Sequence, residues 1–160
     1  MNIKTLATSG IIAALYVAVT LAILPLAFSN IQFRISEMFN HLIVFDKKYF
    51  FGIVIGVFIA NLFSPLGLYD IVFEIGMTAI SLAVTIFSAK FIDGIVKRML
   101  FNTIVFSFFG FLIAIELNIV FELPFLIGWL TVAIGEFVVM MIGIPIMTAL
   151  NKRLNFKELI

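Results

Sequence analysis

The chain has 160 residues, of which 64% are hydrophobic and 12% are charged, and its formal net charge is +1. Soluble domains carry about 25% charged residues, so a mean hydropathy of +1.27 predicts an all-α integral membrane protein with a single domain over residues 1–160. The absence of cysteine excludes disulfides and thiolate chemistry, and a single histidine argues against a histidine-based metal cluster. No phosphate-binding loop of the Walker type occurs, so any ATP must be bound by another chain.

Polar breaks divide the chain into six apolar segments. The first segment follows one lysine and is too long for the core of a signal peptide, so we interpret it as a retained span. Turn signals stand at 64–67 and 121–124, and we expect Pro145 to kink or adjust the last segment. The predicted segments are 5–28, 31–46, 49–64, 70–92, 99–120 and 125–150.

The segment at 31–46 is a polar island that contains the only histidine, His41, together with Arg34 and Glu37. In an α-helix these three side chains share one face, because they are three and four residues apart. Ionisable groups on one face of a membrane helix indicate a functional site. The alternative is an amphipathic helix on the lipid surface, since some 15 residues reach only about 22 Å.

The placement of this island decides between six spans and five. Six spans with a cytoplasmic N-terminus put nine of the ten basic residues inside and leave Arg34 outside. Five spans with an external N-terminus move Arg34 inside and Lys4 outside, so that nine of the ten basic residues are again inside. The positive-inside rule therefore does not separate the two topologies. In both, the external side gathers acidic residues, which are Asp70, Glu74, Glu116 and Glu122, with Glu37 added in the six-span topology.

Small residues form two strips at four-residue spacing, one on the first segment and one on the third. Such a strip is a flat helix face that another helix can approach closely. It either packs inside this bundle or docks on a partner membrane protein, and the longer strip is the better docking candidate. The first strip is Gly10, Ala14, Ala18 and Ala22, and the second is Gly52, Gly56 and Ala60.

Two carboxylates lie within apolar segments, where an unpaired charge costs about 2.5–3.5 kcal/mol. Glu74 begins a polar stripe and should face the bundle or a water-filled pocket, with Tyr69 and Asp70 near the mouth of that pocket. Glu136 lies near the bilayer midplane, with Trp129 seven residues earlier on nearly the same face. A carboxylate below a stacking indole suits a planar ligand with N–H donors. Alternatively, Glu136 pairs internally with a basic or polar side chain of the chain and Trp129 anchors near the interface.

An acidic cavity open to the outside suits the capture of a cation or a donor-rich heterocycle, and Glu116 is a further candidate for such a site. No hydrolase triad or metal-dependent transferase motif occurs, so we expect no catalytic residue, metal or cofactor. Two rivals stay open. A membrane enzyme acting on lipid would need a reactive cluster on the cytoplasmic side, and an accessory subunit would pair its acids internally.

The run Gln-Phe-Arg-Ile-Ser-Glu at 32–37, after a segment with Ala14 and Ala18 and before a short helix, resembles the QueT family. Its members are substrate-binding S components of energy-coupling factor (ECF) transporters, and the resemblance covers essentially the whole chain. It implies six helices, cytoplasmic termini and a partner module of one transmembrane coupling protein and two ATPases. In that family the strip on the first helix docks on the coupling protein.

The resemblance also implies queuosine precursors as substrates, for example 7-aminomethyl-7-deazaguanine, which has a guanine-like N–H edge and a cationic amine. Carboxylates match those donors, and Trp129 is available for stacking. Another vitamin or purine-like solute is the alternative. The family's ligand contacts are not carried over, so the candidate binding residues come from the patterns above. They are Arg34, Glu37, His41, Tyr69, Asp70, Glu74, Glu116, Trp129 and Glu136.

Overall fold

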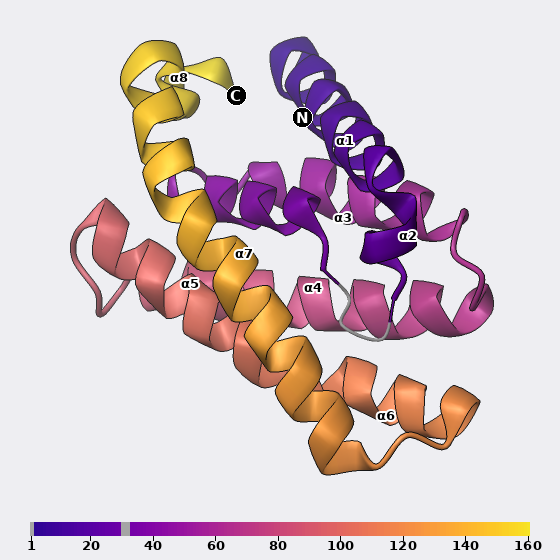
Figure 1. Cartoon of the computed structure of the whole chain (residues 1–160). Coiled ribbons are helices and arrows are strands. Elements are labelled where there is room, and N and C mark those ends of the chain that lie inside the picture. The colour runs from indigo at the N-terminus through magenta and orange to yellow at the C-terminus, as the bar shows by residue number, and fades with distance from the viewer. Residues whose placement is uncertain (1, 30–32) are drawn as a thin grey trace.

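The computed structural model describes residues 2–29 and 33–160, which form helices joined by short loops (Figure 1). The predicted turns at 64–67 and 121–124 both separate helices. The helices are α1 (Ile3–Ala22), α2 (Leu24–Ala27), the 3-10 helix η1 (Ile35–Val44), α3 (Tyr49–Asn61), α4 (Leu68–Ser88), α5 (Ile95–Phe109), α6 (Phe111–Phe121), α7 (Phe125–Leu154) and α8 (Phe156–Leu159).

Four stretches in the described part of the chain are long and apolar enough to cross a membrane: α1, α4, α5 with α6, and α7. Helix α3 is apolar but has only 13 residues, a length of about 20 Å at 1.5 Å per residue. Large apolar side chains cover much of the outer surface, where they would face lipid. These features confirm an all-α membrane protein.

The polar island is a 3-10 helix, so its prediction as an α-helix was wrong, and its first residues, 30–32, lie outside the described residues. A 3-10 helix rises about 2.0 Å per residue and aligns every third side chain. Ten residues therefore reach about 20 Å, and Glu37 falls in line with Asn40 rather than with His41.

Two predicted segments are interrupted. The first was predicted as one helix over 5–28, but α1 ends at Ala22 and α2 follows, with Pro25 in its first turn, where proline is tolerated. The fifth was predicted over 99–120, but it begins at Ile95 and breaks at Gly110. A Cβ on Gly110 would lie 3.1 Å from both Ser107 O and Val132 Cγ1, so the break allows close contact with α7.

The two small-residue strips have different surroundings. The strip on α3 packs against α1: a Cβ on Gly52 would lie 3.0 Å from Ser9 Cα, and one on Gly56 would lie 2.9 Å from Tyr16 Cβ. This strip is internal packing. All four residues of the strip on α1 are exposed, and they are Gly10, Ala14, Ala18 and Ala22.

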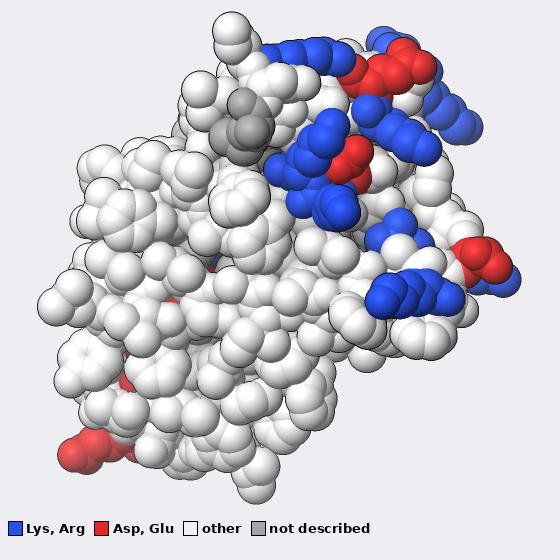
Figure 2. Space-filling view, turned by 180° about the vertical axis from the view of Figure 1, so that it is seen from behind, with Lys and Arg blue, Asp and Glu red and all other residues white. Residues whose placement is uncertain are grey.

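Both ends of the chain lie at the same end of the bundle (Figure 1). The Lys4 ammonium donates to the Glu158 carbonyl, and Thr8 Oγ1 donates to Leu159 O at 2.8 Å. Tyr49, at the start of α3, donates its hydroxyl to Phe156 O at 2.7 Å. Figure 2 shows lysine and arginine side chains gathered at this end, with some acidic side chains among them and further acidic side chains at the far end of the same view.

Candidate functional site

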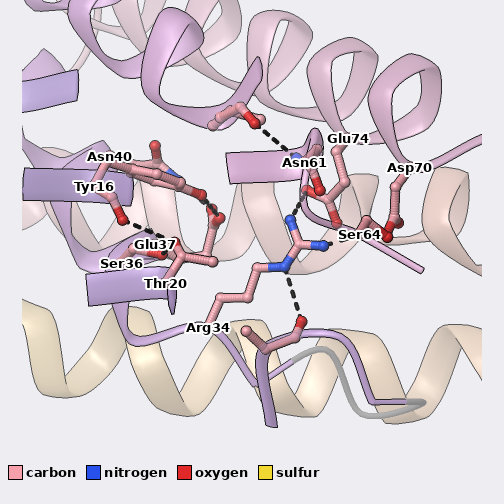
Figure 3. A network of polar contacts seen from close by, with 12 residues as sticks. Tyr16, Thr20, Arg34, Ser36, Glu37, Asn40, Asn61, Ser64, Asp70 and Glu74 are labelled. Atoms are coloured by element: carbon pink, nitrogen blue, oxygen red, sulfur yellow. Dashed lines mark hydrogen bonds and ion pairs between the residues drawn. The ribbon is translucent and has the colours of Figure 1, made fainter. Parts of the chain in front are cut away.

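Arg34 is the centre of a buried polar network between α1, η1 and α4 (Figure 3). It lies in extended backbone just before η1 and is 1% exposed. Its Nε donates to Ala27 O at 3.0 Å, and its Nη1 lies 3.0 Å from Glu74 Oε2. Its Nη2 lies 3.8 Å from Asp70 Oδ1, and its Cζ lies 4.8 Å from the Phe28 ring centroid. One guanidinium therefore ties the end of α2 to two carboxylates of α4.

Glu37 forms a second part of this network, on the side of α1. Its carboxylate accepts hydrogen bonds from the Tyr16 hydroxyl and from Asn40 Nδ2. Beside it, the Thr20 and Ser36 hydroxyls lie 2.6 Å apart. These contacts join η1 to α1 and satisfy the carboxylate within the protein.

Asp70 is held at the start of α4 by the turn that precedes the helix. The Ser64 hydroxyl donates to Asp70 and accepts the Leu66 N–H at 3.0 Å. Gly67 has φ +59°, a left-handed conformation that favours glycine, and it precedes the first residue of α4. A carboxylate in the first turn of a helix is also stabilised by the helix dipole.

Two further carboxylates have oxygens that receive no N–H or hydroxyl hydrogen bond from the described residues. Glu116 on α6 is 0% exposed and Glu136 on α7 is 3% exposed. In the described part of the chain, no N–H or hydroxyl donor reaches either Glu116 oxygen or the buried Glu136 Oε2. Glu116 instead meets another carboxyl group, that of Asp70. Both carboxylates interact electrostatically with Glu74 and with Arg34, which places them at the same network.

The site contains many more acidic groups than basic groups. The described part of the chain buries one guanidinium, which pairs with two carboxylates, and five carboxylates in all; they are Glu37, Asp70, Glu74, Glu116 and Glu136. Buried carboxylates need charge-assisted hydrogen bonds or a cation to offset the loss of water. The arrangement therefore suits a ligand that brings positive charge or several N–H donors.

The structure brings six predicted site residues together, but His41 has separate contacts. Its Nε2 lies 2.9 Å from Met140 O and its Nδ1 lies 3.3 Å from Asn102 Nδ2. Because a carbonyl accepts and an amide N–H donates, the His41 ring is neutral, with Nε2 as the donor and Nδ1 as the acceptor. The prediction that His41 shares a face with Arg34 was wrong, because the spacing assumed an α-helix.

Trp129 and Tyr69 also have surroundings other than the network. The Trp129 indole donates to Phe108 O at 3.0 Å, and its ring packs 5.8 Å from the Phe108 centroid. A seven-residue separation on α7 corresponds to about 10.5 Å along the axis, so a shared face does not bring Trp129 to Glu136. Tyr69 is 49% exposed while Asp70 is fully buried, because successive helical side chains point about 100° apart.

Several functional neighbours were not predicted. A buried tyrosine hydroxyl usually has a partner, so Tyr16, in the middle of an apolar helix, was a usable signal. Asn40 lies three residues after Glu37, a spacing that makes neighbours in an α-helix as well as in a 3-10 helix, so it too could have been predicted. Thr20, Ser36 and Ser64 are common residue types whose contacts follow from the tertiary structure.

An apolar cavity of about 220 Å³ lies elsewhere, between α1, η1, α7 and α8. Its lining includes Ile12, Phe39, Leu42, Met147 and Phe156, and no charged side chain. The polar side chains of its described lining are Thr8 and Tyr49, whose hydroxyls already donate to backbone carbonyls, so we assign the candidate site to the carboxylate network.

Comparison with known proteins agrees with a membrane transporter. The profile of the QueT transporter family matches residues 6–152. The Queuosine precursor transporter QueT of Lactococcus lactis subsp. cremoris (strain MG1363) is 39% identical over 159 residues, which cover 94% of each chain. No solved structure matches the chain. Both matches describe transporters, which confirms the prediction of a multi-pass membrane transport protein rather than an enzyme. The chain therefore belongs to the QueT transporter family.

Proposed function

We propose that this chain is the substrate-binding S component of an ECF-type importer that captures a queuosine precursor from outside the cell. The observation that carries the proposal is the group of five buried carboxylates around one guanidinium. A similar protein is named a queuosine precursor transporter. The precursor 7-aminomethyl-7-deazaguanine combines a planar N–H edge with a cationic amine, and both are donors to carboxylates.

We further propose that residues 1–160 form one domain that crosses the membrane six times, with both termini in the cytoplasm. Basic side chains gather at the end of the bundle where both termini lie (Figure 2). As a 3-10 helix, η1 has a length of about 20 Å, similar to that of α3. Arg34, in extended backbone just before η1, adds to this reach, so the island becomes a short second crossing with Arg34 toward the outside.

The energy for uptake would come from partner subunits, a transmembrane coupling protein and two ATPases. The sequence has no Walker loop of its own. An exposed strip of small residues on α1 offers a flat face to another membrane helix. It consists of Gly10, Ala14, Ala18 and Ala22.

Calorimetric titration of the purified protein with 7-aminomethyl-7-deazaguanine tests the substrate. We expect saturable binding with one ligand per chain. Binding of another purine or vitamin instead would keep the receptor function and replace the substrate. If neither this compound nor any member of a panel of purines and vitamins bound to the protein, the receptor function would be refuted.

Co-purification tests the partners separately. Affinity purification of the chain from its native membrane should recover the coupling protein and both ATPases. Their repeated absence, with ligand binding intact, would leave a solute-binding membrane protein without an ECF module. An accessory subunit would show neither the partners nor the ligand.

A further inference from the structure

Hydrogen bonds divide the five buried carboxylates into two groups. Glu37 accepts from Tyr16 and Asn40, and so its carboxylate is already satisfied. Asp70 and Glu74 share one guanidinium, and Asp70 also accepts from a serine hydroxyl. These three carboxylates hold η1, α1 and α4 together. They belong to the internal framework of the site, and Asp70 also keeps one oxygen, Oδ1, without a hydrogen-bond partner among the described residues.

Glu116 and Glu136 make up the other group. The fold buries both, and in the described part of the chain no N–H or hydroxyl donor reaches either Glu116 oxygen or Glu136 Oε2; Glu116 meets only the Asp70 carboxyl group. An uncompensated buried carboxylate destabilises a protein, and such a cost is typical of sites that a ligand completes. They are the carboxylates that the folded chain leaves for a ligand.

These two carboxylates lie toward different parts of the network. The Glu116 carboxyl group meets that of Asp70, whereas the carboxylates near Glu136 are those of Glu37 and Glu74. Figure 3 shows Glu37 and Asp70 on opposite sides of the Arg34 guanidinium. A ligand that reaches both therefore needs donors at two separate positions.

We propose, on the basis of the function proposed above, that Glu116 and Glu136 recognise two different ends of one ligand. Glu116, together with Asp70, binds a primary ammonium group. Glu136 accepts the N–H edge of a planar heterocycle. An ammonium is a compact charge with three donors, which suits two carboxylates from different helices. A planar edge with two parallel donors matches a single carboxylate.

Two ligands and two variants separate these roles. The ligand 7-aminomethyl-7-deazaguanine carries both the ammonium and the N–H edge, whereas 7-cyano-7-deazaguanine keeps the edge and lacks the ammonium. Glu116→Gln should weaken binding of the aminomethyl compound by roughly tenfold to a hundredfold, the loss expected for a hydrogen bond to a charged group. It should leave the cyano compound nearly unchanged. Glu136→Gln should weaken both ligands by similar factors.

The control is Glu122→Gln, which makes the same chemical change at an exposed loop position and should leave both affinities unchanged. Equal losses for both ligands in Glu116→Gln, or no loss, would overturn the division of roles while the function itself stands. Failure of the unmutated protein to bind either ligand would refute the proposed function instead. Thermal unfolding without ligand separates structure from recognition: neither glutamine variant should unfold earlier than the unmutated protein, and an earlier transition would assign that residue to the framework.

Discussion

Arg34 connects parts of the chain that lie far apart in sequence. It bonds the Ala27 carbonyl and pairs with Asp70 and Glu74, and so it positions the residues before η1 against α4. In a low-dielectric interior, such pairs are costly to form and still more costly to break. The guanidinium fork reaches three acceptors in different directions, which a lysine ammonium cannot reproduce. We therefore assign Arg34 to the framework of the site.

Removal of this guanidinium should destabilise the protein strongly. Arg34→Met leaves Asp70 and Glu74 without their cation, and breaking a buried pair in this way costs about 3–5 kcal/mol in the free energy of unfolding. Arg34→Lys keeps the charge and should lose part of that amount. Chemical unfolding in detergent, followed by circular dichroism, measures both. The matched control is Arg153→Met at an exposed position, which should change the free energy by less than about 0.5 kcal/mol. An unchanged Arg34→Met would show that the pairs contribute nothing.

At the scale of single residues, the sequence shows which residues are unusual, but it does not show which of them contact one another. Arg34, Glu74 and Glu136 could be predicted as site residues because ionisable groups are costly in an apolar bundle. Their pairing depends on contacts between distant helices, which spacing along one helix cannot show. Trp129 was misplaced for this reason, since its indole meets Phe108 on α5.

The contact between η1 and α7 determines the geometry of the island at the scale of elements. A Cβ on Gly143 would lie 2.7 Å from Met38 Cβ and 3.2 Å from His41 Cδ2. The two helices therefore meet almost backbone to backbone at this glycine. The position of the island could be predicted from its polarity, but its 3-10 form could not, because ten residues fit periods of 3.0 and 3.6 almost equally well.

A methyl group at Gly143 should disturb this contact. Because no real Cβ tolerates a 2.7 Å neighbour, Gly143→Ala must push η1 away from α7, at a cost of about 1–3 kcal/mol in the free energy of unfolding. Gly76→Ala on α4 is the matched control, since its Cβ would meet nothing within 4 Å and should stabilise the helix by up to about 1 kcal/mol. Urea unfolding of both variants measures the difference. Equal effects at the two glycines would contradict the close approach.

The whole molecule combines a basic end, a buried acidic site and one exposed strip of small residues. Composition was sufficient to predict an all-α membrane protein, because a soluble core cannot absorb this apolar surface. Charge counting did not choose between five and six crossings, since exchanging Lys4 for Arg34 leaves the total unchanged. The small-residue strips on α1 and α3 have the same spacing but different surroundings, and the local sequence cannot show this difference. The strip on α3 is covered by α1, and the strip on α1 is exposed.

Tryptophan at Ala14 and Ala18 should abolish transport and spare ligand binding. Both alanines are exposed on α1, so the bulky rings would block a partner helix without entering the bundle. Uptake of labelled 7-aminomethyl-7-deazaguanine, in cells that produce the complete transporter, measures transport. Calorimetry on the purified variant measures binding, which should stay within about twofold of the unmutated protein, well under the tenfold step that corresponds to 1.4 kcal/mol.

Two single variants test whether this effect comes from docking. Ala83→Trp places the same ring at an exposed position on α4 and should preserve both uptake and binding. Ala13→Trp, at a position that is 5% exposed and faces Gly56, should disrupt α1 against α3 and lose both. If the double variant at Ala14 and Ala18 behaved like Ala13→Trp, the strip would be internal packing. If the double variant behaved like Ala83→Trp, the strip would face only lipid, and the partner module would have to bind another face of the bundle.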